Sequence, residues 1–227
     1  MNIVITGASK GIGRELVNIL SADKKVKRIF AISRDKKLLG NFSDKKVICI
    51  PFDIASGNYA TLIKEIKKHN SEIEILINNA GAIVNKPFEK ISVDELKYVY
   101  EVNVFGAFQL SQLMVPLMKG RNAHIVNISS MGGYQGSIKF AGLSAYSSSK
   151  GALSILSECM AEELKEKNIA VNCLCLGATQ TEMLTKAFPD YEAPLTAKEM
   201  AEFIADFAIN GNKYFNGKIL PVSLSTP

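Results

Sequence analysis

A tyrosine and a lysine one helical turn apart are the residues of this chain whose spacing most favours acid–base chemistry. Tyr146 and Lys150 open a helix predicted over Ala145–Lys167, and at i and i+4 they share one face of it. A phenol has a pKa of about 10, and a neighbouring ammonium favours its ionised form. A second pair at this spacing, Tyr214 and Lys218, spans an Asn-Gly sequence that predicts a turn. The first pair is therefore the candidate acid–base pair.

A glycine-rich turn near the N-terminus could hold a phosphate group. Ile3–Thr6 predicts a buried strand, and Gly7, Gly11 and Gly13 predict the turn that opens into a helix near Ile12. Glycines let backbone N–H groups approach a pyrophosphate, and the helix N-terminus adds partial positive charge. The spacing is neither the dinucleotide G-x-G-x-x-G nor a P-loop, so a plain strand-turn-helix is the alternative.

Strand-like and helix-like segments alternate along the whole chain. The predicted strands are Ile3–Thr6, Arg28–Ser33, Lys46–Phe52, Ile73–Asn78, His124–Ser129, Ile169–Leu176 and Lys218–Val222. The predicted helices begin near Ile12 or cover Tyr59–Lys68, Ser92–Lys119, Ala145–Lys167 and Thr196–Ile209. This alternation predicts an α/β fold, a doubly wound parallel sheet of the Rossmann type with helices on both faces. No linker or repeat divides the chain, so we expect residues 1–227 to form a single domain.

Residues that follow the strands matter most, because ligands of such sheets bind at the carboxyl ends of the strands. Ser33-Arg34 follows the second strand, where an NAD-selective site usually has a carboxylate and an arginine accommodates a 2′-phosphate. Lys10, in the glycine turn, adds a second cation, and Asp35 comes one residue too late to be the carboxylate. These residues predict a phosphorylated cofactor, with an incidental surface arginine as the alternative.

Small and polar residues follow the next three strands. Asp53-Ile54 ends the third, Asn78–Gly81 (Asn-Asn-Ala-Gly) ends the fourth, and Ser129-Ser130 ends the fifth. Such residues allow a close backbone approach to a ligand, although an ordinary turn after the fourth strand would look the same.

Taken together, these motifs resemble the short-chain dehydrogenase/reductase family over nearly the whole chain. The residues that carry the resemblance are Thr6-Gly7-x-x-x-Gly11-x-Gly13, Asn78-Asn79-Ala80-Gly81, Asn103 in V-N-V-F-G, Ser130 in N-I-S-S, and Tyr146-x-x-x-Lys150. The resemblance implies an NADPH-dependent oxidoreductase that transfers hydride between the nicotinamide and a carbonyl or secondary alcohol substrate. A cofactor-binding regulatory or interaction protein with vestigial dehydrogenase machinery is the alternative.

The resemblance also implies a role for each catalytic residue. Tyr146 would be the general acid/base, and Lys150 would lower its pKa and hold the nicotinamide ribose. Ser130 would stabilise charge on the substrate oxygen, and Asn103 would anchor a water chain to the lysine. The alternatives are a helix kink for Asn103 and strand-end hydrogen bonding for Ser129.

The predicted cofactor is NADP(H) in preference to NAD(H), and no metal is expected. The cofactor-binding residues are predicted to be Gly7, Ser9, Lys10, Gly11, Ile12, Gly13, Ser33, Arg34, Asp53, Ile54, Asn79, Ala80, Gly81, Tyr146, Lys150, Gly177, Thr179 and Thr181.

The chain departs from the family pattern near its C-terminus. Leu176-Gly177 replaces the usual Pro-Gly, whereas Thr181 keeps the position expected to contact the nicotinamide carboxamide. The interval from Ser130 to Tyr146 is long, and a short apolar lid over the substrate is expected at about 182–197. The usual Asp-Gly-Gly after the last strand is missing, which favours a homodimer through the two long helices over a tetramer.

Composition excludes several other classes of protein. Residues 1–70 hold 14 Lys/Arg and 6 Asp/Glu, a net charge of +8, but the lysines lie in scattered pairs and predict no nucleic-acid site. No apolar run reaches the ~18 residues of a membrane span. Four cysteines and 2 histidines lack ligand spacing for a metal and suggest reduced, buried thiols. With a first strand that starts at residue 2, we expect a cytoplasmic protein without a signal peptide.

Overall fold

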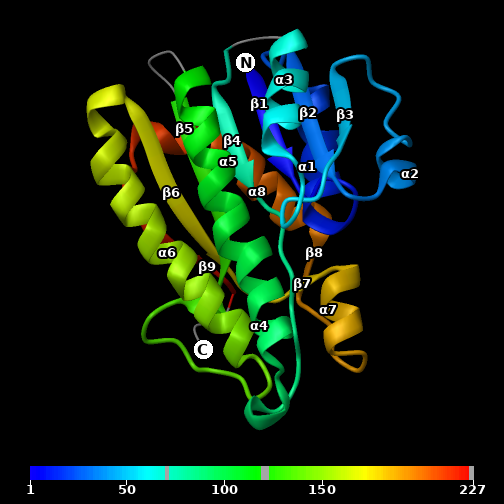
Figure 1. The fold of residues 1–227 in the computed structure, drawn as a ribbon, viewed down its shortest axis with the longest axis vertical. Coiled ribbons are helices and arrows are strands. Elements are labelled where there is room, and N and C mark those ends of the chain that lie inside the picture. The colour runs from blue at the N-terminus through cyan, green and yellow to red at the C-terminus, as the bar shows by residue number, and fades with distance from the viewer. Residues whose placement is uncertain (70–71, 119–122, 225–227) are drawn as a thin grey trace.

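A seven-stranded parallel sheet forms the centre of the computed structural model, which describes residues 1–69, 72–118 and 123–224 (Figure 1). In spatial order the strands of this described part are β3 (Val47–Pro51), β2 (Arg28–Ser33), β1 (Asn2–Thr6), β4 (Ile75–Asn78), β5 (Ala123–Ser130), β6 (Ile169–Leu176) and β9 (Ile219–Val222). Every neighbouring pair is parallel. Because β1 lies between β2 and β4, the chain order reverses beside it, where such sheets bind their ligands.

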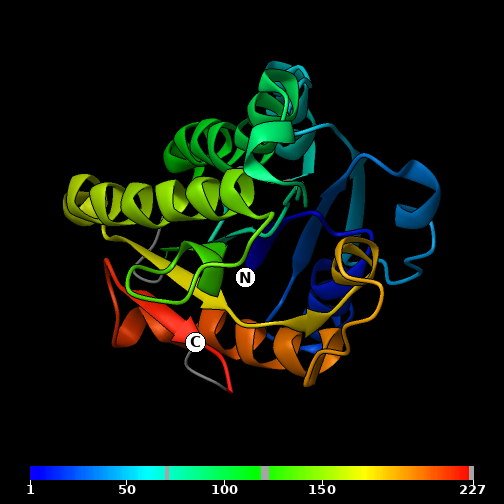
Figure 2. The same cartoon turned by 90° about the horizontal axis from the view of Figure 1, so that it is seen from below.

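Helices cover both faces of the sheet (Figure 2). α1 (Gly11–Ala22) and α8 (Ala197–Asn210) pack on one face, and α3 (Tyr59–His69), α5 (Gly106–Met114) and α6 (Ser144–Leu164) pack on the other. Strand side chains complete a hydrophobic core under each layer. The predicted doubly wound α/β fold is therefore confirmed.

Several short elements were not predicted. They are the helices α2 (Lys36–Leu39) and α7 (Glu182–Ala187), the paired strands β7 (Thr179–Gln180) and β8 (Leu195–Thr196), and 3₁₀ turns at Phe88–Lys90, Met131–Gly133 and Gly211–Lys213. β4 is shorter than the predicted Ile73–Asn78, and Ile73 forms only an isolated bridge to Met118. Among the helices of the described residues, none combines the length and hydropathy that crossing a bilayer requires.

The stretch predicted to be helical over Ser92–Lys119 is helical from Val93 to Leu117, but it is not one regular α-helix. It begins as α4 (Val93–Tyr100) behind the predicted Ser92–Glu95 capping box, passes through a π-helical turn at Glu101–Phe105, and continues as α5 and a 3₁₀ turn at Val115–Leu117. Pro116 in that last turn cannot donate a helical hydrogen bond, which explains the end of α5. Lys119 lies outside the described residues.

The expectation of buried thiols holds for only half of the cysteines. All four are free, and Cys173 and Cys175 on β6 are buried, but Cys49 is only partly buried and Cys159 on α6 is exposed.

Gly13 lies where α1 meets the loops that follow β1 and β4. A Cβ built on it would stand 2.2 Å from the Gly7 carbonyl oxygen and 2.5 Å from Asn79 Nδ2. Glycine is therefore required at this position by the close packing of the protein itself.

Gly13→Ala should therefore destabilise the fold even without cofactor, by about 1–3 kcal/mol, as overpacking does in tight sites. Urea unfolding measures this loss. Gly40→Ala is the control, because a Cβ there would make ordinary contacts of 3.5 Å at a φ of −63°. Equal stability of Gly13→Ala and the wild type would contradict the close approach.

Candidate active site

The glycine turn presents unpaired backbone donors at the carboxyl edge of the sheet. Gly7 and Gly11 have φ of +68° and +49°, a conformation that favours glycine. The N-cap of α1 is Lys10, and no side chain of the described residues caps this helix N-terminus. Its first N–H groups are thus available to an anion, so the turn fits the pyrophosphate of a dinucleotide.

The loop after β4 is tied to the end of β1. The Thr6 hydroxyl accepts hydrogen bonds from the backbone N–H groups of Asn79 and Ala80, each at 3.0 Å. The Asn79 side-chain amide donates to the Thr6 carbonyl at 2.9 Å. Asn79 therefore positions the loop with its side chain, and the approach to a ligand falls to the backbone of Ala80 and Gly81.

The residues predicted to bind the 2′-phosphate of the cofactor follow β2. Ser33 and Ser9 share a hydrogen bond of 2.7 Å between their hydroxyls, which joins this strand end to the glycine turn. Arg34 and Lys10 are both exposed. The Asp35 carboxylate accepts from the N–H of Leu38 and caps α2, so its role is structural.

The two residues predicted after β3, Asp53 and Ile54, make their contacts within the protein. Asp53 accepts a hydrogen bond from the backbone N–H of Ala55 at 3.0 Å, and Ile54 is buried against Gly106. The carbonyl of Ile54 accepts from the Tyr59 hydroxyl at 2.7 Å.

Asn103 is buried inside the π-helical turn and connects two other elements. Its amide donates to the Ala82 carbonyl and to the Ser149 hydroxyl, each at 2.9 Å, and its oxygen accepts from the Ala82 N–H at 2.7 Å. A Cβ built on Gly81 would lie 3.6 Å from both Asn103 Oδ1 and Lys150 Nζ. Asn103 therefore links the loop after β4 to α6 next to the lysine. It also lies in the π-helical turn, a helix distortion of the kind that we named as the alternative for this residue.

The lysine of the predicted pair is buried, with 3% of its surface exposed. Its ammonium donates to the Ile128 carbonyl at 2.7 Å and lies 5.9 Å from the centroid of the Tyr146 ring. Burial lowers the pKa of Lys150 to about 8, although the nearby thiols of Cys173 and Cys175 act in the opposite direction.

The phenol of Tyr146 stays protonated at neutral pH. Burial raises its pKa above the ordinary value of about 10, and a hydrogen bond with Ser130 only partly offsets this effect. Desolvation of the phenol is the largest effect on this pKa, and the lowering that we expect from Lys150 stays a prediction. A protonated phenol is the form that can donate a proton.

The two serines after β5 have different environments. The Ser129 hydroxyl is buried and donates to the Lys150 carbonyl at 2.8 Å, so it supports the helix backbone. The Ser130 hydroxyl is partly exposed, lies beside Tyr146, and accepts from the Gly132 N–H at 3.2 Å. Ser130 is therefore the serine that can reach a substrate.

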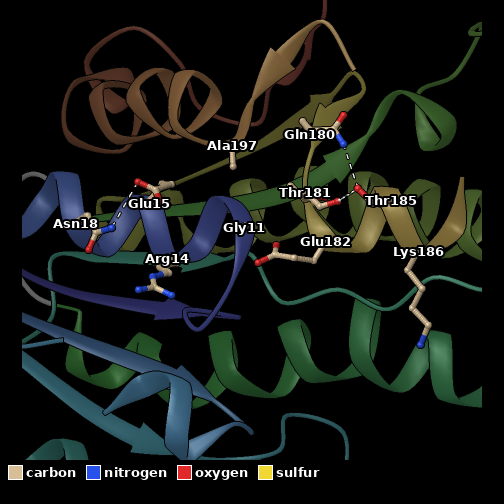
Figure 3. Close-up of a pocket in the computed structure, with 10 residues that line it drawn as sticks. All are labelled: Gly11, Arg14, Glu15, Asn18, Gln180, Thr181, Glu182, Thr185, Lys186 and Ala197. Atoms are coloured by element: carbon tan, nitrogen blue, oxygen red, sulfur yellow. Dashed lines mark hydrogen bonds between the residues drawn. The ribbon is translucent and has the colours of Figure 1, made fainter. Parts of the chain in front are cut away.

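The segment after β6 lies across a groove from α1 (Figure 3). This groove has a volume of about 810 Å³. It is lined on one side by Gly11, Arg14 and Glu15 and on the other by Gln180, Thr181, Glu182, Thr185 and Lys186. The Thr181 hydroxyl accepts from the Leu184 N–H as the N-cap of α7, and its methyl lies 3.1 Å from a Cβ built on Gly11. The Glu182 carboxylate extends toward Gly11 (Figure 3).

The remaining predicted residues of this segment lie at its start. Thr179 is buried, and its hydroxyl donates to the Gly177 carbonyl at 3.3 Å. A Cβ on Gly177 would collide with Ser223, so glycine is needed there for packing beside β9. Within the described residues, no group of three or more His, Cys, Asp or Glu side chains could hold a metal ion.

Two contributors were missed from the sequence. Ser149 completes the contacts of Asn103, and Tyr98 on α4 accepts a hydrogen bond from Arg34 Nη1 at 2.7 Å. Ser149 lies inside the tyrosine–lysine motif and could have been found from the helical period. No sequence signal pairs Tyr98 with a residue 64 positions earlier.

Known proteins are similar to this chain in sequence and in fold. The sequence model of the family described as short chain dehydrogenase matches residues 1–192. The ketoacyl reductase HetN of Nostoc sp. is 30% identical over 190 residues, which cover 80% of this chain and 64% of that protein. Carbonyl reductase [NADPH] 2 of Sus scrofa is 30% identical over 88% of this chain and 80% of its own length. The chain thus spans less than two thirds of HetN but most of the carbonyl reductase.

A solved structure extends the likeness to nearly the whole fold. A 4-hydroxyisoleucine dehydrogenase mutant, complexed with NADH and succinate, superposes with a TM-score of 0.86 at 24% identity. The match covers 98% of this chain and 97% of the other. The chain belongs to the short-chain dehydrogenases, an oxidoreductase family, which confirms the recognition made from its motifs.

The burial of Lys150 should make the stability of the fold depend on alkaline pH. Above about pH 8 the folded chain has released a proton that the unfolded chain holds until about pH 10.5, so the free energy of unfolding rises with pH. Between about pH 7.5 and 9.5 the wild type should gain about 2 kcal/mol relative to Lys150→Met. Urea unfolding of both proteins measures this difference, and a difference that does not change with pH would contradict the shifted pKa.

Proposed function

We propose that this chain is an NADPH-dependent oxidoreductase that reduces a carbonyl group or oxidises the corresponding secondary alcohol. The observation that carries the proposal is Tyr146 beside Ser130, with the buried Lys150 one helical turn further on. The names of the relatives, a ketoacyl reductase and an NADPH carbonyl reductase, support the same chemistry.

The roles of the residues follow from their positions. Tyr146 donates its proton to the carbonyl oxygen, and Ser130 donates a hydrogen bond to the same atom. Lys150 supplies positive charge below the phenol and so stabilises the phenolate that remains. Asn103 keeps the loop of Ala82 against α6. When bound, the cofactor would supply the hydride from its nicotinamide. The glycine turn would hold its pyrophosphate, and Gly81, Lys150 and Thr181 would hold its nicotinamide end.

The segment 182–197 is proposed as the lid over the substrate. The Asn85 amide donates to the Ala187 carbonyl at 2.8 Å and ties the end of α7 to the loop after β4. Met183 brings an apolar group to within 3.8 Å of a Cβ built on Gly81, beside the lysine. Because this lid is apolar, we expect the substrate to carry an uncharged group next to its carbonyl.

We also propose a homodimer, formed through the segment α4–α5 and through α6. Phe105, Phe108 and Ile155 on these helices are exposed by 53%, 49% and 57%, which is unusual for large apolar side chains. A monomer in sedimentation velocity would exclude this dimer.

The cytoplasm remains the proposed location, and the four free cysteines support it.

Tyr146→Phe tests the acid–base assignment. The variant keeps the aromatic ring but loses the proton, so it should bind NADPH normally and lose turnover by roughly 10²–10⁴-fold. The assay is NADPH oxidation with a carbonyl that the wild type reduces, chosen from a panel. Tyr214→Phe is the control, because Tyr214 is 80% exposed and precedes a turn at Gly217. Full turnover by Tyr146→Phe would refute the assignment. A wild type that binds NADPH but neither reduces a carbonyl nor oxidises an alcohol would favour the regulatory alternative.

Arg34→Ala tests the preference for the phosphorylated cofactor. The loss of a charge-assisted contact should weaken NADPH binding by about 1.5–3 kcal/mol and leave NADH binding nearly unchanged. Titration of both cofactors by fluorescence gives the two affinities. Lys37→Ala, which removes an exposed cation of α2, is the control. An equal loss for NADPH and NADH would mean that Arg34 does not contact the 2′-phosphate.

A further inference from the structure

The guanidinium of Arg34 is held by a residue from the opposite side of β1. Arg34 follows β2, and its Nη1 donates to the hydroxyl of Tyr98 on α4 at 2.7 Å. α4 follows β4, so this bond spans the point where the order of the strands reverses. Tyr98 is 40% exposed, and the hydrogen bond is therefore formed at the surface, where a ligand can reach it.

We propose that Tyr98 is a specificity-determining positioning residue, which holds Arg34 to receive the 2′-phosphate of the cofactor. The inference rests on the proposed preference for NADPH. A guanidinium has five N–H donors, and the bond to Tyr98 engages only the Nη1 group. Among the described residues, no other group accepts a hydrogen bond from Arg34, so its other donors are available to a phosphate.

A neutral partner suits this role better than an acidic one. A carboxylate would orient Arg34 equally well but would compensate its charge and repel a phosphate. The adjacent acid, Asp35, accepts from the Leu38 N–H at the start of α2, and within the described residues Arg34 forms no ion pair. Tyr98 therefore orients the cation without neutralising it.

Tyr98 can fix the arginine because α4 is itself fixed. The Ser92–Glu95 capping box holds the helix N-terminus, and Lys86 forms an ion pair with Glu95. Val99, the next residue, is fully buried. An exposed arginine loses many rotamers when it binds a ligand, and an arginine already held by Tyr98 loses fewer.

Other groups around Arg34 suit the same anion. Lys10 is exposed in the glycine turn, and the hydroxyls of Ser9 and Ser33 are joined at 2.7 Å between that turn and the end of β2. A phosphate that binds here would meet two cations and two hydroxyls. Tyr98 adds the orientation of the second cation.

The experiment isolates the phosphate from the rest of the cofactor. Adenosine 2′,5′-bisphosphate and 5′-AMP, which lacks the 2′-phosphate, are titrated by calorimetry into the wild type, Tyr98→Phe, Arg34→Ala and the double variant. Tyr98→Phe should weaken bisphosphate binding about two- to tenfold and leave 5′-AMP binding unchanged. In the Arg34→Ala background, Tyr98→Phe should have no further effect, because its role is exerted through the arginine.

Tyr100→Phe is the matched control. It lies on the same helix, its hydroxyl makes no hydrogen bond within the described residues, and its ring lies 6.4 Å from that of Phe105. It should change neither affinity. Circular dichroism of each variant confirms that the fold is retained.

The remaining outcomes each overturn a defined part of the account. If Arg34→Ala selectively weakens the bisphosphate but Tyr98→Phe does not, the role of Tyr98 is wrong and the cofactor preference stands. A tighter bisphosphate complex with Tyr98→Phe would mean that Tyr98 holds the arginine away from the phosphate. Tyr98→Phe could instead weaken the binding of the bisphosphate and of 5′-AMP equally, or weaken it also in the Arg34→Ala background. Either result would make Tyr98 a general contact of the adenosine. If the wild type binds the two ligands equally, the proposed preference itself fails.

Discussion

The burial of the Lys150 ammonium is the constraint on which the rest of the site depends. A charged amine with 3% exposure is unfavourable unless the surrounding groups compensate it, and here the Ile128 carbonyl accepts its hydrogen bond. Desolvation raises the pKa of the half-buried Tyr146 and lowers that of Lys150 to about 8. The phenol is therefore a proton donor at neutral pH, and the amine beside it is easily titrated.

The neighbouring elements are built around this lysine. Ser129 fixes the backbone of Lys150, and Asn103, from a π-helical turn, binds both the Ala82 loop and Ser149. A regular α-helix over residues 101–105 would give the Asn103 side chain a different direction. The π-helical turn thus serves the site around Lys150, whereas the glycine turn follows β1 at the carboxyl edge of the same sheet.

Sequence reasoning was strongest where a residue type has one physical explanation. The alternation of strands and helices predicted the parallel sheet, and the spacing of Tyr146 and Lys150 predicted their common helix face. It failed where burial or a distant partner decides the result. The pKa of Tyr146 depends on desolvation, which spacing does not reveal, and the contact of Arg34 with Tyr98 joins residues 64 positions apart. The two close neighbours of Gly13, the Gly7 carbonyl and the Asn79 amide, likewise become visible only in the folded chain.

The central claim, that this site delivers hydride and proton to one carbonyl group, is tested most directly by isotope transfer. The wild type is mixed with a panel of ketones and aldehydes and with NADPH that carries deuterium at one of the two C4 positions of the nicotinamide. Mass spectrometry of the alcohols should show one carbon-bound deuterium per product from one of the two labelled cofactors and none from the other. Alcohol products without deuterium from either cofactor, or no alcohol although NADPH binds, would contradict the account.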